Sequence, residues 1–227
     1  PLVGVPHWRR PAHLARNPVH VTLRSGLSRL RDRRVFPAMR DAIASSTRPG
    51  FRVILFSVQP DHVHLVIEAR DSSTLASGLR GLAIRSALAV NRITRRSGPV
   101  WKDRYHRHDL KTPREVRNGF NYVLQNWKKH VEGAVGVDPC SSGPWFDGWR
   151  AGAGATASTR GEGDERRAEE PPNGPAPVAR PTTWLASVGW RRHGLLSLSE
   201  MPGGARRDRL ATRPRKVRNS KITNTRA

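Results

Sequence analysis

The sequence is poor in cysteine and in long apolar runs. Cys140 is the only cysteine among 227 residues, so no intramolecular disulfide can form and a zinc site built from cysteines is excluded. The longest apolar runs, such as Val53 to Phe56, are too short to span a bilayer. No signal-peptide pattern and no Walker-type glycine loop occurs. We therefore expect a cytoplasmic protein without an ATP-binding loop.

Acidic residues are also scarce. The chain has 18 Asp and Glu against 41 Lys and Arg, a formal net charge of +23. Such an excess predicts a polyanionic partner, and nucleic acid is the leading candidate because the basic residues are spread along the whole chain. The other interpretation is a generally cationic, arginine-rich protein from a GC-rich genome.

The apolar pattern of residues 15–135 predicts alternating strands and helices. In chain order we expect a strand at 19–24, a helix from about 37, strands at 51–59 and 62–69, a helix at 72–94, a strand at 100–110 and a helix at 113–130. The two middle strands are joined by a turn at Pro60-Asp61, and Ser72 or Ser73 is the expected N-cap of the long helix. This order is typical of an α+β fold, an antiparallel sheet with helices packed on it.

The last predicted helix has the strongest start signal. Thr112-Pro113-Arg114-Glu115 combines a capping box with proline at the first helical position. Apolar residues then recur at helical spacing, which marks the buried side of the helix: Val116, Phe120, Val123 and Trp127.

The composition changes after this domain. We expect a short extension at 136–150 and a disordered linker at 151–181, which is rich in Gly, Ala, Pro and Glu. Residues 182–203 form an amphipathic segment, predicted to dock through Trp184 and Trp190. We expect residues 204–227 to form a basic, disordered tail that adds electrostatic affinity for phosphates.

Two histidines lie in "PDHVHLVIEA", residues 60 to 69. Side chains alternate along a strand, so His62 and His64 share one face while Val63, Leu65 and Ile67 point to the core. Neutral imidazoles that share a face can bind one metal ion. The alternative is a pair of partly exposed histidines on a polar face.

A rival pair, His106 and His108, lies in "RYHRHDL". Arg107 stands between them, so no apolar residue anchors the strand there. We interpret this pair as facing DNA or as simply exposed.

Tyrosine is scarce as well, since only Tyr105 and Tyr122 occur. Asn118, Tyr122 and Asn126 recur at spacing four and fall on one polar face of the last helix. Such a tyrosine can offer its hydroxyl to a substrate, and Asn126 can offer a carbonyl oxygen to a metal. The other interpretation is an ordinary tyrosine at the rim of the core.

Three separated motifs, "PDHVHLVIEA", "VWKDRYH" and "YVLQN", together resemble the single-tyrosine transposases of the HUH class, and within it the REP-associated tyrosine transposases. The resemblance covers about residues 15 to 135 and implies a ferredoxin-like, RRM-like sandwich. It implies that His62 and His64 bind Mg²⁺ or Mn²⁺, that Asn126 completes the site and that Tyr122 is the nucleophile. The family usually has proline directly after that asparagine, where this chain has Trp127. Gln125 is the alternative third ligand.

The implied function is that of a metal-dependent single-stranded DNA endonuclease and strand transferase, which acts through a 5′-phosphotyrosine on hairpins of palindromic repeats. We expect a monomer or homodimer, associated with the nucleoid, that binds DNA through basic residues and one histidine: Arg80, Arg85, Arg104, His106, Arg107, Lys128 and Lys129. Two alternatives stay open. One is a domesticated, catalytically silent hairpin-binding protein; the other is a replication or conjugation initiator of the same class, which the short chain without a helicase disfavours.

Overall fold

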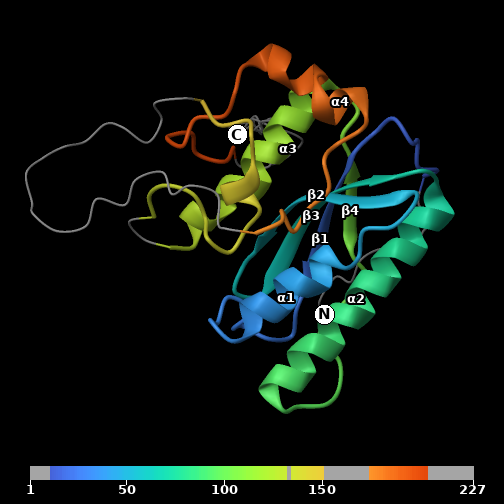
Figure 1. The fold of residues 1–227 in the computed structure, drawn as a ribbon, viewed down its shortest axis with the longest axis vertical. Helices are drawn as coiled ribbons and strands as arrows, with labels where there is room; N and C mark the ends of the chain where they lie inside the picture. The colour runs from blue at the N-terminus through green and yellow to red at the C-terminus, as the bar shows by residue number, and fades with distance from the viewer. Residues whose placement is uncertain (1–10, 132–133, 151–173, 204–227) are drawn as a thin grey trace, which may run out of the picture.

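A computed structural model describes residues 11–131, 134–150 and 174–203. Its centre is a four-stranded sheet with the order β2-β3-β1-β4, in which every pair of neighbouring strands is antiparallel (Figure 1). The strands are β1 (Val19–Arg24), β2 (Phe51–Val58), β3 (His62–Ala69) and β4 (His106–Asp109). The principal helices are α1 (Val35–Ala44), α2 (Ser72–Thr94) and α3 (Pro113–Gln125). The predicted α+β class and the antiparallel sheet are confirmed.

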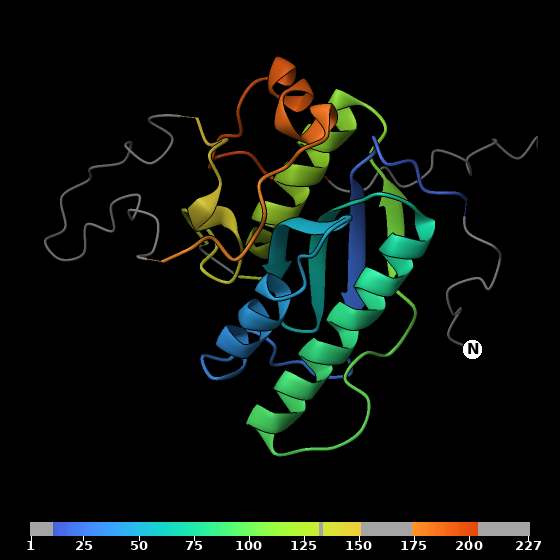
Figure 2. The same ribbon diagram turned by 45° about the vertical axis from the view of Figure 1, so that its right-hand side comes forward.

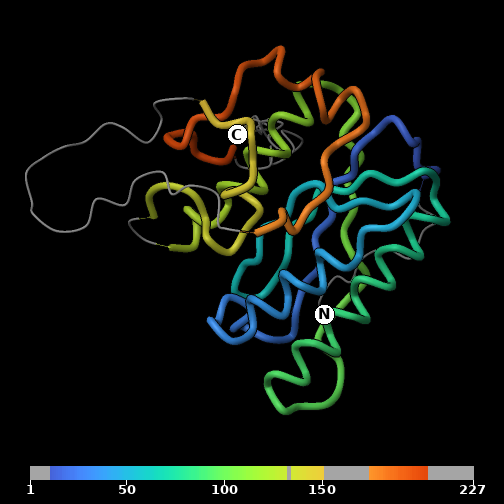
Figure 3. Tube along the Cα trace, viewed as in Figure 1, coloured from blue at the N-terminus to red at the C-terminus, as the bar shows by residue number. Residues whose placement is uncertain are grey.

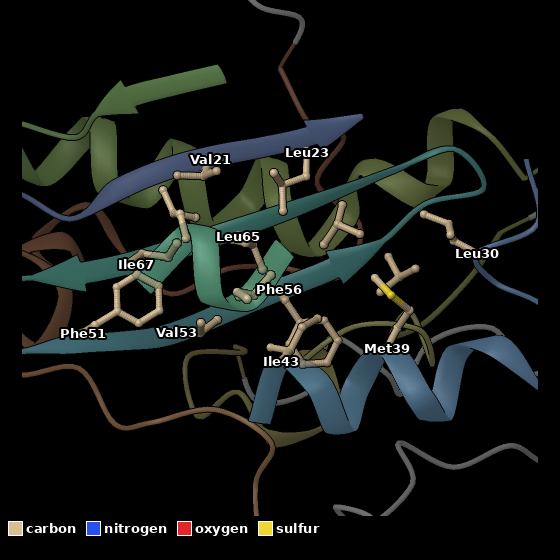
Figure 4. Close-up of a cluster of buried hydrophobic side chains, with 14 of the residues drawn as sticks. Val21, Leu23, Leu30, Met39, Ile43, Phe51, Val53, Phe56, Leu65 and Ile67 are labelled. Carbon is tan, nitrogen blue, oxygen red and sulfur yellow. The ribbon is translucent and has the colours of Figure 1, made fainter. Parts of the chain in front are cut away.

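Helices α1 and α2 cover one face of the sheet, and α3 crosses the other (Figures 1 and 2). The alternation predicted for β3 is confirmed, because Val63, Leu65 and Ile67 lie in the core beneath α1 and α2. Figure 4 shows part of this core, where Phe56 and Leu65 of the sheet lie near Met39 and Ile43 of α1.

The face beneath α3 has a second apolar core. Val66 of β3 packs there with Val116, Phe120 and Val123 of α3. A β-bulge in β2, between Val53 and Leu55, inserts one extra residue into that strand. Because of the bulge, both Ile54 and Leu55 contact this core.

The segment 174–203, which we call the C-terminal strap, lies alongside α3 and the β2 edge (Figure 3). It contains α4 (Trp184–Ser187) and the 3-10 helix η3 (Gly189–His193). Trp190 is 1% exposed and packs against Phe120, as expected for a docking residue. Trp184 is only half-buried: the residue is 49% exposed, and Arg192 lies over its ring.

One buried carboxylate fixes the start of the strap. Glu68 of β3 is 3% exposed and accepts hydrogen bonds from the backbone N–H groups and hydroxyls of Thr182 and Thr183. Just before them, the N–H of Ala179 donates to the carbonyl of Val53. The structure describes residues 174–181, the last part of the predicted linker, and joins them to β2 through this bond of Ala179. The rest of that linker, 151–173, and the tail at 204–227 lie outside the described residues.

The extension at 136–150 follows the free edge of β2. The N–H of Val58 donates to the carbonyl of Cys140, and that of Ser142 donates to the carbonyl of Phe56. Asp138 is fully buried and forms a bidentate ion pair with Arg31. The extension thereby protects an edge strand from pairing with other chains.

Three predicted boundaries need correction. Strand β4 is only four residues long, because residues 102–105 interrupt the pairing with β1. Trp101 forms only an isolated bridge with Ser25, and its indole N–H donates to the carbonyl of Ala83 in α2. The N-cap of α2 is Asp71, whose carboxylate accepts from the N–H of Thr74. Helix α3 ends at Gln125 and continues as the 3-10 helix η1 (Asn126–Lys129).

The predicted start of α3 is confirmed. The Thr112 hydroxyl accepts from the N–H of Glu115. The carboxylate of Glu115 reaches back to the N–H of Lys111, one residue before the cap.

Among the described residues, no helix combines the length and apolar composition that a bilayer crossing needs.

Candidate active site

The two imidazoles of β3 converge beneath α3. The Nε2 atoms of His62 and His64 lie 3.0 Å apart. His64 is 3% exposed, because α3 covers the face on which it lies, while His62 is nearer the rim. The strand alternation therefore places both rings on one face, and the helix turns that face into a buried site.

Asn126 brings an amide to the same point. Its Nδ2 atom lies 3.3 Å from Nε2 of His64, and a half-turn of the amide exchanges its nitrogen with its oxygen. Gln125 points away from the histidines: its amide nitrogen donates to Oδ1 of Asn121 at 2.5 Å and to the carbonyl of Ser197 at 3.0 Å. Of the two alternative ligands, the structure brings Asn126 to the site.

Tyr122 lies one helical turn before Asn126, and its ring contacts the same histidines. Its ring centroid is 5.1 Å from that of His64 and 5.5 Å from that of His20. Asn118, on the same helix face, is exposed at the outer end. The other tyrosine, Tyr105, packs against the core on the opposite side of the sheet. The structure thus brings together Tyr122 and all three predicted metal ligands.

Sequence reasoning missed several neighbours of these residues. His20 and Thr22 lie on β1, and their side chains reach Nδ1 of His64 at 3.2 and 3.1 Å. Asp61 accepts from Nδ1 of His62 at 2.7 Å, and His130 lies 3.4 Å from Nδ2 of Asn126. The alternation His20-Val21-Thr22 has the same period as His62-Val63-His64, a signal that would have placed both pairs on one sheet face.

Burial controls the charge of these groups. Desolvation lowers the pKa of His64 well below its usual range, and it lowers the pKa of His20 to about 4, with a smaller effect from His108. Desolvation also raises the pKa of Tyr122. At neutral pH, His20 and His64 are therefore neutral imidazoles and Tyr122 is a protonated phenol.

The residues fit a small divalent cation of mixed nitrogen and oxygen preference. Nε2 of His62 and Nε2 of His64 would supply two nitrogen donors that lie 3.0 Å apart, and the amide of Asn126 would supply an oxygen donor. Within the described ranges, no cluster of three or more His, Cys, Asp or Glu side chains is suited to a metal. The third protein ligand here would therefore be the amide of Asn126.

Comparison with known proteins finds several similar solved structures, among them the two that follow. One is described as a REP-associated tyrosine transposase bound to a REP hairpin, with 19% identity, a TM-score of 0.47 and coverage of 56% of this chain and 74% of that chain. The other is a putative transposase from Deinococcus radiodurans R1, with 19% identity, a TM-score of 0.36 and coverage of 41% of this chain and 78% of that one. No family model and no curated protein sequence matches the chain.

The residues predicted to bind DNA are scattered around the molecule. Arg80 and Arg85 lie on α2, on the side of the sheet opposite Tyr122. Arg104 and His106 are exposed near the start of β4. Arg107 is committed to a bidentate ion pair with Asp109 and is mostly buried. DNA contact by these residues stays a prediction.

Two adjacent lysines at the end of α3 differ in their surroundings. Lys128 donates to Oε1 of Gln125 and to the carbonyl of Leu198 in the strap. Lys129 is exposed, and its Nζ lies 5.2 Å from the ring centroid of Tyr122. Lys129 is therefore the better placed of the two to meet a phosphate beside Tyr122.

Proposed function

We propose that the protein is a metal-dependent, single-stranded DNA nicking and joining enzyme of the transposase type, with Tyr122 as nucleophile and a hairpin as substrate. The observation that carries the proposal is the contact of the Tyr122 ring with His64, whose Nε2 converges with that of His62. The basic composition of the chain supports a DNA substrate.

His62, His64 and Asn126 would hold the cation. When bound, Mg²⁺ or Mn²⁺ neutralises the charge of a phosphodiester and orients it for attack. The protein's own groups supply the rest. Tyr122 is anchored by the helix above the histidines, and Lys129 provides a second positive charge at the exposed side of its ring.

The reaction follows from the nucleophile. Attack by the Tyr122 hydroxyl on phosphorus forms a tyrosyl phosphate at the 5′ side and releases the 3′ oxygen. The phenolic proton ends on that oxygen, giving a 3′-hydroxyl. The phosphoester energy is conserved, so the returning hydroxyl can rejoin strands without ATP.

The deciding experiment is the substitution Tyr122→Phe. It removes one oxygen from a half-buried ring, so we expect the fold and the hairpin affinity to persist. The covalent protein–DNA adduct should vanish. Hairpin DNA from the flanks of the gene, incubated with Mn²⁺ and resolved on a denaturing gel, measures this.

The matched control is Tyr105→Phe, which should keep the adduct because Tyr105 packs on the other side of the sheet. If the Tyr122→Phe protein still formed the covalent adduct, Tyr122 would not be the nucleophile. Hairpin binding by the wild type with no adduct on any flanking hairpin would favour a silent binding protein.

A further inference from the structure

The metal site proposed above needs both histidines in one tautomer. If Nε2 of His62 and of His64 are to bind a cation, each must carry its lone pair there and its proton on Nδ1. A protonated Nδ1 in a buried site needs an acceptor. The surroundings of the two Nδ1 atoms therefore decide whether the site is ready for a cation.

His62 has an acceptor that cannot act as a donor. Its Nδ1 lies 2.7 Å from Oδ1 of Asp61, the residue just before it in the turn between β2 and β3. An ionised carboxylate only accepts hydrogen bonds, so this contact requires the proton on Nδ1. The free lone pair of His62 then points at His64.

His64 has two possible acceptors on the neighbouring strand. Oγ1 of Thr22 and Nε2 of His20 lie 3.1 and 3.2 Å from its Nδ1. Thr22 is the register partner of His64 in the β1–β3 ladder, so the sheet itself fixes this contact. Both atoms can accept, and either is enough for the Nδ1–H tautomer.

We propose that Asp61 and Thr22, with His20 beside Thr22, are positioning residues that hold His62 and His64 with both Nε2 lone pairs aimed at one point. The inference rests on the proposed function only in taking that point as a cation site. Asp61 has the stronger effect, because its carboxylate allows only one tautomer of His62. Thr22 and His20 both offer an acceptor to Nδ1 of His64, so neither is needed alone.

Two measurements on Asp61 variants test the proposal. Long-range ¹H–¹⁵N NMR of the metal-free protein reports which ring nitrogen of His62 bears the proton. Electron paramagnetic resonance of free Mn²⁺ gives the dissociation constant without DNA. The side chain of Asp61 is 66% exposed, so its variants should fold.

We expect Asp61→Ala to lose the pure Nδ1–H signal of His62 and to bind Mn²⁺ about 10-fold or more weakly, a typical effect of losing a partner of a metal-binding histidine. Asp61→Asn keeps an acceptor oxygen and should retain the tautomer and most of the affinity. Thr22→Val should weaken binding less than Asp61→Ala, because His20 remains. Asp103→Ala, at an exposed position outside the site, is the control and should bind as the wild type does.

Wild-type affinity together with the wild-type tautomer in Asp61→Ala would overturn the proposal. Equal weakening in Asp61→Asn and Asp61→Ala would also overturn it, since charge rather than hydrogen bonding would then be at work. If the wild type bound no Mn²⁺, the cation site itself would be wrong. The tautomer of His62 would still decide the role of Asp61, because that signal is read without metal.

Discussion

Residues that are close together in this sequence can have very different surroundings in the structure. His62 and His64 are two positions apart, yet one lies at the rim while the other is sealed beneath α3. Lys128 and Lys129 are adjacent, yet one is bound by the strap and the other faces outward over Tyr122. Substitutions at adjacent positions should therefore have unlike effects.

The two lysines give one such prediction. Lys129→Ala should lower the slope of log affinity against log salt by about 0.7 to 0.9, the value for one lost phosphate contact. Lys128→Ala should leave the slope unchanged and reduce the free energy of unfolding by about 1 to 3 kcal/mol, because it leaves the Leu198 carbonyl without its donor. Salt-dependent hairpin titration and urea unfolding measure the two effects; equal slopes for both variants would contradict the assignment.

Metal removal provides a second prediction at this scale. Chelation with EDTA should stop cleavage and spare hairpin binding, since affinity comes mainly from basic side chains. Mn²⁺ should restore cleavage at a lower concentration than Mg²⁺, because two of the protein ligands are imidazole nitrogens. His64→Ala should not be rescued by either ion. Cleavage at full rate in EDTA would rule out the metal-dependent mechanism.

At the scale of elements, α3 is the helix that carries Tyr122, and the strap holds this helix in place. Four side chains on one side of the helix and its 3-10 extension bond to backbone carbonyls of the strap: Arg117, Asn121, Gln125 and Lys128. Tyr122 and Asn126 project from another side, toward the sheet. The strap thus fixes the rotation of the helix that places Tyr122 over the histidines.

The Arg117–Glu200 ion pair makes this attachment sensitive to acid. Burial alone would raise the pKa of Glu200, but hydrogen bonds from Arg117 and the N–H of Ser197, with the charge of Arg117, lower it on balance. A carboxylate with a lowered folded pKa stabilises the protein above its unfolded value, about 4.3, and the stabilisation disappears as pH falls through the folded pKa. Glu200→Gln should therefore unfold more readily than the wild type at pH 7, with a difference that narrows toward pH 3.

Thermal unfolding across that pH range measures the difference. Arg117→Met is the companion variant and should cost about 2 to 3 kcal/mol at pH 7, because the guanidinium also donates to the carbonyls of Gly194 and Leu195. If the difference in unfolding temperature between Glu200→Gln and the wild type stayed constant from pH 7 to pH 3, this account would be contradicted.

For the whole molecule, charge is the dominant property. The net charge of +23 is spread over the chain, and residues 206–226 hold nine Lys and Arg with Asp208 as the sole acidic residue. Such a charge raises the affinity for any polyanion, and this affinity falls steeply as the salt concentration rises.

Deletion of residues 204–227 should flatten the dependence of log affinity on log salt while leaving the cleavage rate at saturating DNA unchanged. The reason is that fewer counterions are released when fewer phosphates are contacted. Hairpin titrations at several salt concentrations, beside single-turnover cleavage, measure both quantities. An unchanged slope would show that the tail makes no contact with DNA.

The sequence was sufficient for the local features. Alternation in "HVHLVI" correctly separated the core side of β3 from the histidine side, and the capping box located the start of α3. The spacing of Tyr122 and Asn126 correctly predicted that they share a helix face. Each of these features depends on residues close together in the chain, so a repeating pattern could reveal it.

Only the tertiary structure decided which distant residues meet. Thr22 reaches His64 because β1 pairs with β3 in one register, and Glu68 holds Thr182 and Thr183 from more than a hundred residues away. The strap also decides which of the two amides lies beside the histidines: the carbonyl of Ser197 accepts from the amide of Gln125, and Asn126 is the residue that reaches His64. Such contacts join separate elements across the fold, and no local pattern of side chains encodes them.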